Sequence, residues 1–132
     1  MSRLIADTNI LLRSVIEDDP AQTIKARQLL TSAEQVVVPN IALCEFAWVA
    51  SRLYRHNKAQ IGRSIRLLTA EPRVVIDKPA VEAGLSFLEA GGDFADGIIA
   101  FDGQRLGGEV FATFDKKAAS ILENAGMMVS LL

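Results

Sequence analysis

Cysteine and histidine are nearly absent from this 132-residue sequence, which contains one of each. One cysteine excludes an internal disulfide, and one cysteine with one histidine excludes the clusters that hold zinc. No apolar run approaches the roughly 20 residues of a membrane-spanning helix. The first apolar stretch ends at Asp7, which leaves no room for the hydrophobic region of a signal peptide. We therefore expect a cytoplasmic protein that does not associate with membranes.

The length and composition fit one domain covering residues 1–132. Half of the residues are hydrophobic, 6% are aromatic and 23% are charged, as is usual for a soluble α/β protein. A chain of this length buries roughly two thirds of its unfolded surface around one core. A second domain is therefore not expected.

Charge is distributed unevenly along the chain, although the formal net charge is only −2. Residues 51–66 contain no acid, and the rest of the chain holds nine Lys and Arg against 16 Asp and Glu. The basic residues of this segment are Arg52, Arg55, Lys58, Arg63 and Arg66. A basic surface next to an acidic one suits a polyanion held near metal ions, so the segment is a candidate RNA contact. A solvated helix face or a protein-binding surface is an equally open interpretation.

Apolar periodicity, Pro and Gly predict alternating strands and helices. Strands are expected at 3–7, 34–38, 74–76, 110–113 and 127–130. Helices are expected at 8–16, 20–32, 41–54 with Asn40 as its cap, 58–69, 78–90, 94–104 and 116–125. This alternation predicts a three-layer α/β/α domain with a central, mainly parallel five-stranded sheet.

Four carboxylates lie within or beside strongly apolar stretches: Asp7, Glu45, Asp96 and Asp115. Ionised carboxylates in apolar surroundings are costly unless they are paired or bind a cation. Asp7 and Asp115 each follow a predicted strand, and ligands of α/β proteins bind at the carboxyl ends of strands. The pattern therefore predicts one shared metal site.

Each acid also has a plainer interpretation. Asp7 and Asp115 can cap the helices that follow them, and Asp93 and Asp96 share a helix face near its start, where capping is again an alternative. Four separate caps or pairs would have no reason to fall together at positions compatible with one ligand. We therefore favour the joint site and give Asp93 a supporting role.

Glu45 is expected to point into packed surroundings. Ile41, Trp48 and Val49 lie three or four residues from it on the same predicted helix face. A buried ion pair with an arginine is the alternative to a metal ligand.

A site made of carboxylates, without His or Cys, selects Mg²⁺, with Mn²⁺ as a substitute. The chemistry that such a site favours is hydrolysis of a phosphodiester bond by an activated water. Thr8, Asn9 and Thr113 supply neighbouring hydroxyl and amide groups that can support the site.

In these motifs the chain resembles PIN-domain ribonucleases, specifically the VapC-type toxins of bacterial toxin–antitoxin pairs. The motifs are Leu-Ile-Ala-Asp-Thr-Asn-Ile-Leu-Leu at 4–12, Pro-Asn-Ile-Ala-Leu-Cys-Glu at 39–45, Phe-Ala-Asp-Gly-Ile-Ile-Ala at 94–100 and Ala-Thr-Phe-Asp at 112–115. The resemblance runs from end to end, and its specificity comes from the order and spacing of the motifs. The chain departs from the family at Gly97, where Ala often follows the third acid.

The resemblance implies a five-stranded parallel sheet, Mg²⁺-dependent RNA cleavage, a homodimer and a small antitoxin whose tail occupies the active site. It also implies that Asp7, Glu45, Asp96 and Asp115 coordinate the metal, with Thr113 in support. Two alternatives remain: a non-catalytic PIN-like module that binds RNA or protein, and an aspartyl-phosphate phosphatase. The phosphatase usually needs a second acid two residues after the first, where this chain has Asn9.

Overall fold

The computed structural model describes residues 2–132. The chain divides into two compact units, Met1–Asp77 and Lys78–Leu132, and each is described by itself below. In the described part of the chain, no helix is both long and apolar enough to cross a membrane.

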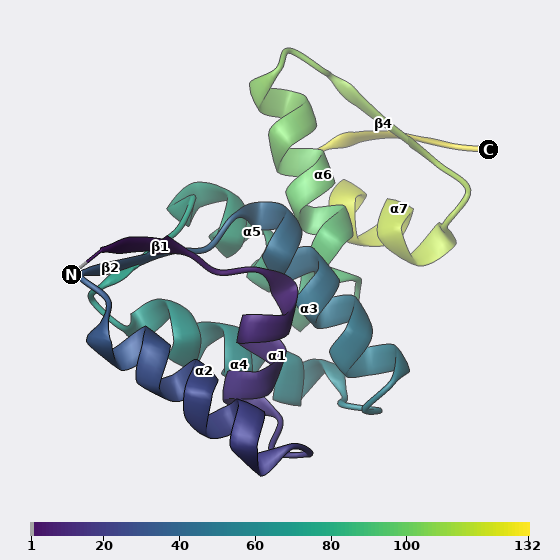
Figure 1. Cartoon of the computed structure of the whole chain (residues 1–132). Helices are drawn as coiled ribbons and strands as arrows, with labels where there is room; N and C mark the ends of the chain where they lie inside the picture. The colour runs from purple at the N-terminus through teal and green to yellow at the C-terminus, as the bar shows by residue number, and fades with distance from the viewer. Residues whose placement is uncertain (1) are drawn as a thin grey trace. The chain divides into compact units, whose positions relative to one another are not determined.

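The first unit contains a parallel three-stranded sheet in the order β1-β2-β3. Its strands are β1 (Arg3–Ile5), β2 (Gln35–Val37) and β3 (Val74–Val75). Leu4 pairs with Val36, and Val36 pairs with Val74. The strands are short and rich in β-branched residues, and β1 runs directly into the first helix (Figure 1).

Four helices complete the first unit: α1 (Thr8–Val15), α2 (Pro20–Ser32), α3 (Asn40–Arg52) and α4 (Lys58–Ala70). α1 packs against both α2 and α3, and α3 packs against α4. Fully buried side chains of this unit include Leu11, Leu43, Phe46 and Ile65. These residues form the apolar centre that holds the helices in place.

The start of α3 differs from the sequence-based prediction. Pro39, not Asn40, is the N-cap residue, and it makes no side-chain capping bond. Asn40 is the first helical residue, and its Nδ2 donates a hydrogen bond to Oδ2 of Asp77 at 3.2 Å. The prediction of Asn40 as the cap was wrong because the helix begins at Asn40 itself, one residue earlier than expected, so that Pro39 occupies the cap position.

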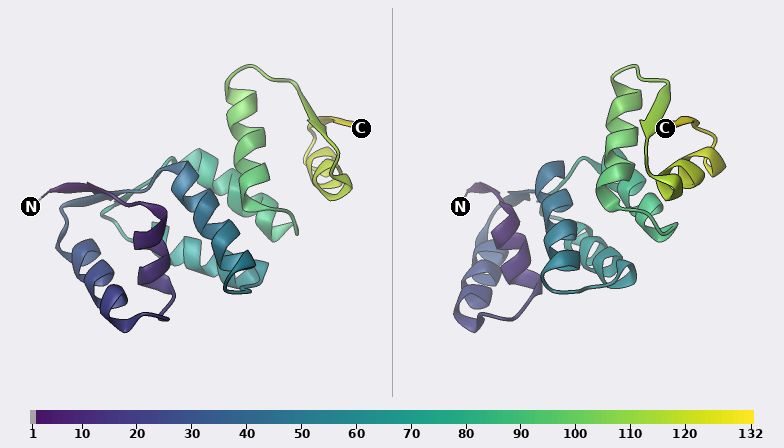
Figure 2. Two further views of the ribbon diagram at one scale, coloured as in Figure 1. Left: turned by 45° about the vertical axis from the view of Figure 1, so that its right-hand side comes forward. Right: turned by 90° about the vertical axis from the view of Figure 1, so that its right-hand side faces the viewer.

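The second unit contains α5 (Lys78–Glu89), α6 (Phe94–Arg105), β4 (Val110–Thr113), α7 (Lys116–Asn124) and β5 (Met128–Leu131). β4 and β5 pair in parallel, with Phe111 opposite Val129. α5 packs along α6, and α7 lies beside the two strands (Figure 2). Phe87, Ala100, Ala118 and Leu122 form the buried cluster that joins these helices.

Glycines let α5 and α6 approach each other closely. A Cβ on Gly97 of α6 would lie 2.7 Å from the carbonyl oxygen of Ala83 and 2.9 Å from Cα of Gly84, both in α5. A Cβ on Gly84 would lie 2.7 Å from the ring of Phe94. Because Gly97 directly follows Asp96, this close contact fixes the position of the Asp96 backbone relative to α5.

The expected α/β fold class is confirmed: strands and helices alternate, and every strand pairing in residues 2–132 is parallel. The pairing itself differs from the prediction, because three strands form one sheet and two form another in place of a single sheet of five. Alternation along the chain predicts parallel pairing, but it does not specify which strand edges meet.

Candidate metal site

Asp7 lies at the carboxyl end of β1 and is the N-cap of α1. Its Oδ1 accepts a hydrogen bond from the backbone N–H of Ile10 at 3.0 Å. The capping interpretation therefore holds for this residue. It does not exclude the metal-site prediction, since the capping bond uses Oδ1 and does not involve Oδ2.

Asp115 occupies the equivalent position in the second unit, at the carboxyl end of β4 and the N-cap of α7. Its Oδ1 accepts hydrogen bonds from the backbone N–H groups of Lys117 and Ala118, at 2.9 and 3.1 Å. The backbone N–H of Asp115 donates to Oγ1 of Thr113 at 2.9 Å. Thr113 thus fixes the turn that carries Asp115.

Asp93 and Asp96 lie at the beginning of α6. Asp93 is the N-cap by backbone geometry, but its carboxylate makes no capping hydrogen bond. Capping therefore does not account for Asp93. Its exposed carboxylate lies one helical turn before Asp96, which is half-buried.

Burial raises the pKa of the Asp96 carboxyl above its ordinary value, and repulsion from Asp93 and then from Asp115 raises it further. Asp93 and Asp115 are therefore both within electrostatic range of Asp96. No compensating cation is among the causes of this shift. This concentration of negative charge is what a divalent cation would neutralise.

Glu45 does not have the packed surroundings that the sequence predicted. It is exposed on α3, together with Ile41 and Trp48 on the same helix face. The prediction was wrong because α3 is apolar on more than one face. The face that is buried carries other residues: Ala42, Leu43, Phe46, Ala47 and Ala50.

Thr8 and Asn9, the remaining predicted supporting residues, are the first two residues of α1 and follow Asp7 directly. The structure therefore places Asp7, Thr8 and Asn9 at one helix start. It places Asp93 and Asp115 within electrostatic range of Asp96. Among residues 2–132, no three His, Cys, Asp or Glu side chains are arranged closely enough to hold a metal ion.

Sequence reasoning overlooked Asp77, which also follows a short apolar strand. Val74-Val75-Ile76-Asp77 repeats the pattern of a strand followed by an acid that singled out Asp7 and Asp115. In the structure Asp77 accepts the hydrogen bond from Asn40 described above. The sequence therefore contained the signal for Asp77. In the structure this acid has a structural role, since it connects the segments that follow β2 and β3.

The five basic residues of the segment 51–66 are all exposed. Arg52 ends α3, Arg55 lies in the turn after it, and Lys58 begins α4. Arg63 and Arg66 follow one turn apart on α4. The exposure is compatible with each interpretation of this segment, as an RNA contact, a protein-binding surface or a solvated face.

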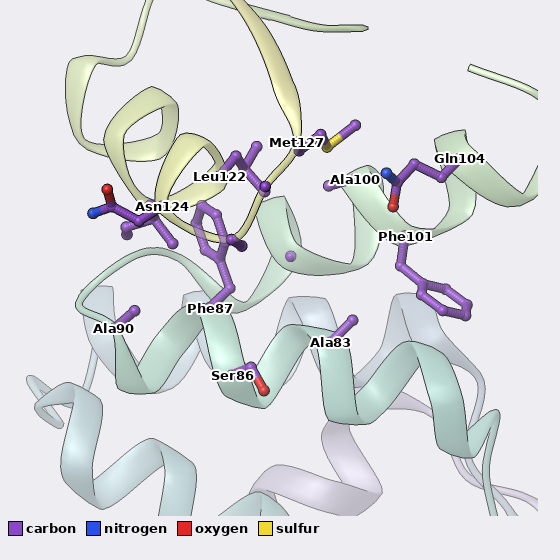
Figure 3. A pocket seen from close by; sticks show the side chains of 14 residues that line it. Ala83, Ser86, Phe87, Ala90, Ala100, Phe101, Gln104, Leu122, Asn124 and Met127 are labelled. Atoms are coloured by element: carbon purple, nitrogen blue, oxygen red, sulfur yellow. The ribbon is translucent and has the colours of Figure 1, made fainter. Parts of the chain in front are cut away.

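A groove of about 470 Å³ lies between α5, α6 and the end of α7. Figure 3 shows Phe87, Leu122 and Met127 around it, with Ala83 on the α5 side and Gln104 on the α6 side. None of the predicted site residues lines this groove. Its apolar lining does not suit a metal or a phosphate.

The PIN domain family matches residues 4–123 of this sequence, so the chain belongs to the PIN-domain family. Seven chains of solved structures also match. One is the crystal structure of Mycobacterium tuberculosis VapC20, described as a sarcin-ricin loop cleaving toxin, with 18% sequence identity and a TM-score of 0.45. The match covers 96% of this chain and 97% of that chain. The curated proteins contain no match.

PIN domains are typically nucleases, and they generally use divalent metal ions. Membership of the family therefore supports hydrolase activity of the nuclease kind. It also confirms the PIN-domain resemblance that the four motifs carried.

Proposed function

We propose that this protein is a Mg²⁺-dependent endoribonuclease, with residues 1–132 forming a single PIN domain. Asp7, Glu45, Asp96 and Asp115 together form its metal site, with Asp93, Thr8, Asn9 and Thr113 in support. The observation that carries the proposal is that Asp93 and Asp115 both lie near enough to Asp96 to raise its pKa, in a chain that belongs to the PIN-domain family.

The donor set fits the proposed ion. Carboxylate oxygens are the ligands that Mg²⁺ and Mn²⁺ prefer, and Asp7 and Asp115 each have one oxygen outside the capping bonds. When bound, the ion would lower the pKa of an attacking water and stabilise charge on the leaving oxygen. The capping bonds to Ile10, Lys117 and Ala118 hold the two strand-end carboxylates in fixed orientations.

The partners follow from the VapC-type resemblance of the motifs. We propose a cytoplasmic toxin of a type II toxin–antitoxin pair that cleaves RNA, forms a homodimer and is neutralised by a small antitoxin. The exposed basic residues of 51–66 supply contacts to the phosphates of the substrate.

The proposal is tested by cleavage of a labelled pool of structured RNAs with purified, antitoxin-free protein in Mg²⁺, Mn²⁺ or EDTA. Cleavage with either ion, lost in EDTA and lost in Asp7→Asn, is the expected result. Asn caps helices as well as Asp does, so Asp7→Asn keeps the bond to Ile10 and isolates the loss of charge. Binding of RNA without cleavage under any condition would instead identify a non-catalytic PIN module.

Replacing Arg63 and Arg66 with Ala is expected to weaken RNA binding and flatten its dependence on salt. Each lost phosphate contact lowers the slope of log K against log salt by about 0.7 for single-stranded RNA, so two contacts remove about 1.4. Fluorescence anisotropy of labelled RNA across a salt series measures the slope. The control is Lys25→Ala, which removes an exposed charge from α2. A slope equal to that of the wild type would exclude these arginines as RNA contacts.

A further inference from the structure

The only tryptophan in the sequence, Trp48, is exposed in the middle of α3. Its exposed fraction is 60%, although helix residues on either side of it in sequence, such as Ala47 and Ala50, are buried. A tryptophan side chain contributes most to stability when it is buried, and exposed aromatic groups mark binding surfaces. The exposure of Trp48 therefore indicates a role in binding rather than in packing of the core.

Trp48 lies on the same helix face as one of the proposed metal ligands. Glu45 precedes it by three residues, so the two side chains are about 4.5 Å apart along the helix axis. Ile41, at 69% exposed, extends this face by another turn toward the start of α3. A molecule resting on Trp48 is thus within one helical turn of the Glu45 carboxylate.

The charge around Trp48 favours an anionic ligand. The guanidinium of Arg52 lies 5.7 Å from the centre of the indole ring, one turn further along α3. Even with this contact, most of the Trp48 surface is exposed. Arg55 and Lys58 follow in the next residues, and both are exposed. An aromatic surface followed by cations is the arrangement that binds single-stranded nucleic acid, with bases stacked on the ring and phosphates on the charges.

We propose that Trp48 is a stacking platform for a nucleobase of single-stranded RNA, with Arg52 contacting the adjoining phosphate. This inference rests on the proposed ribonuclease function and extends it. It makes Trp48 a substrate-binding residue next to Glu45. It also predicts that the nucleotide near the proposed metal site is unpaired. Proteins recognise RNA sequence chiefly at single-stranded bases, which are free to stack on aromatic side chains.

The intrinsic fluorescence of the sole tryptophan reports this contact directly. The Asp96→Asn variant, in which cleavage is expected to be strongly reduced, is titrated with a ten-nucleotide oligoadenylate or with an abasic strand carrying the same phosphates. Oligoadenylate is expected to quench Trp48 fluorescence, and the abasic strand is expected to leave it unchanged. Binding measured by anisotropy of labelled oligoadenylate is expected to weaken about tenfold in Trp48→Ala and to stay within about threefold in Trp48→Phe.

The matched control is Ile41→Ala, which removes an equally exposed apolar side chain from the same face and is expected to leave RNA affinity unchanged. RNA binding without quenching, or with equal affinity in Trp48→Ala, would overturn the stacking proposal and leave the ribonuclease function standing. Loss of a dimer in Trp48→Ala by light scattering, at unchanged RNA affinity, would assign the face to protein contact. Failure of the unsubstituted protein to bind RNA would overturn the ribonuclease function and the stacking with it.

Discussion

Asp96→Asn is expected to reduce RNA cleavage by at least about 10²–10³-fold while raising the thermal stability of the metal-free protein. The loss follows from removing one negative ligand from a site that stabilises charge in the transition state. The gain in stability follows from removing a charge that burial and two neighbouring acids disfavour. A substitution that merely disturbed folding would lower both quantities, so the opposite directions identify a functional charge.

The gain in stability depends on pH. Because the pKa of Asp96 is raised in the folded protein, the folded state holds this proton more tightly than the unfolded chain does. The free energy of unfolding of the wild type therefore falls as pH rises from the ordinary carboxyl range through the raised pKa. In EDTA, we expect Asp96→Asn to melt about 1–4 °C above wild type at pH 7.5 and close to it at pH 4. An Asp96→Asn melting temperature below that of wild type at pH 7.5 would contradict this account.

Asp93→Asn is the matched substitution on the same helix. Its carboxylate is exposed and contributes to the repulsion on Asp96 without being one of the four proposed ligands. We expect partial activity to remain, measured by initial rates of cleavage under the conditions used for Asp96→Asn. Complete loss would move Asp93 from a supporting role into the metal-binding set.

Gly97→Ala is expected to destabilise the protein by about 1–3 kcal/mol. Ala is ordinarily the better helix former, but the added Cβ would lie 2.6 Å from Cβ of Phe87 and 2.7 Å from the carbonyl oxygen of Ala83. Backbone atoms of α5 cannot rotate away, so the two helices must separate. Because Asp96 precedes Gly97, we also expect reduced cleavage, and urea unfolding with cleavage rates measures the two effects.

Gly103→Ala provides the control within the same helix. A Cβ at Gly103 meets no atom within 4 Å, so the substitution has only the helix-propensity effect. It is expected to stabilise the protein by about 0.5–1 kcal/mol. If Gly97→Ala were equally stabilising, the close crossing of α5 and α6 would be wrong.

Much of the fold was predictable from local signals. Asp19 and Pro20 correctly marked the start of α2, and short apolar runs marked β2 and β4. The errors concern contacts between distant segments. Asn40 was predicted to cap α3, but it is the first residue of that helix, and its amide contacts the distant Asp77. The division into two sheets also depends on strand edges meeting, which local patterns do not encode.

The positions of the candidate acids were predictable where an acid directly follows a strand and starts a helix. Asp7 and Asp115 follow strands and start helices, as the sequence indicated, and both cap those helices. The environment of Glu45 was not predictable, because apolar residues on several faces of α3 hid the direction of burial. Trp48 was assigned to packing for the same reason, and its exposure became evident from the structure alone.

The central claim of the proposed function is that Asp7 and Asp115 both contribute to binding one divalent ion. Calorimetric titration of Mn²⁺ into wild type, Asp7→Asn and Asp115→Asn tests it directly, with Glu34→Gln as an exposed carboxylate outside the site. Asn keeps both helix caps, so changes in affinity report charge rather than folding. We predict that Asp7→Asn and Asp115→Asn each weaken the same site by at least about tenfold, while Glu34→Gln does not. Mn²⁺ affinity in Asp7→Asn equal to that of Glu34→Gln would contradict a shared site.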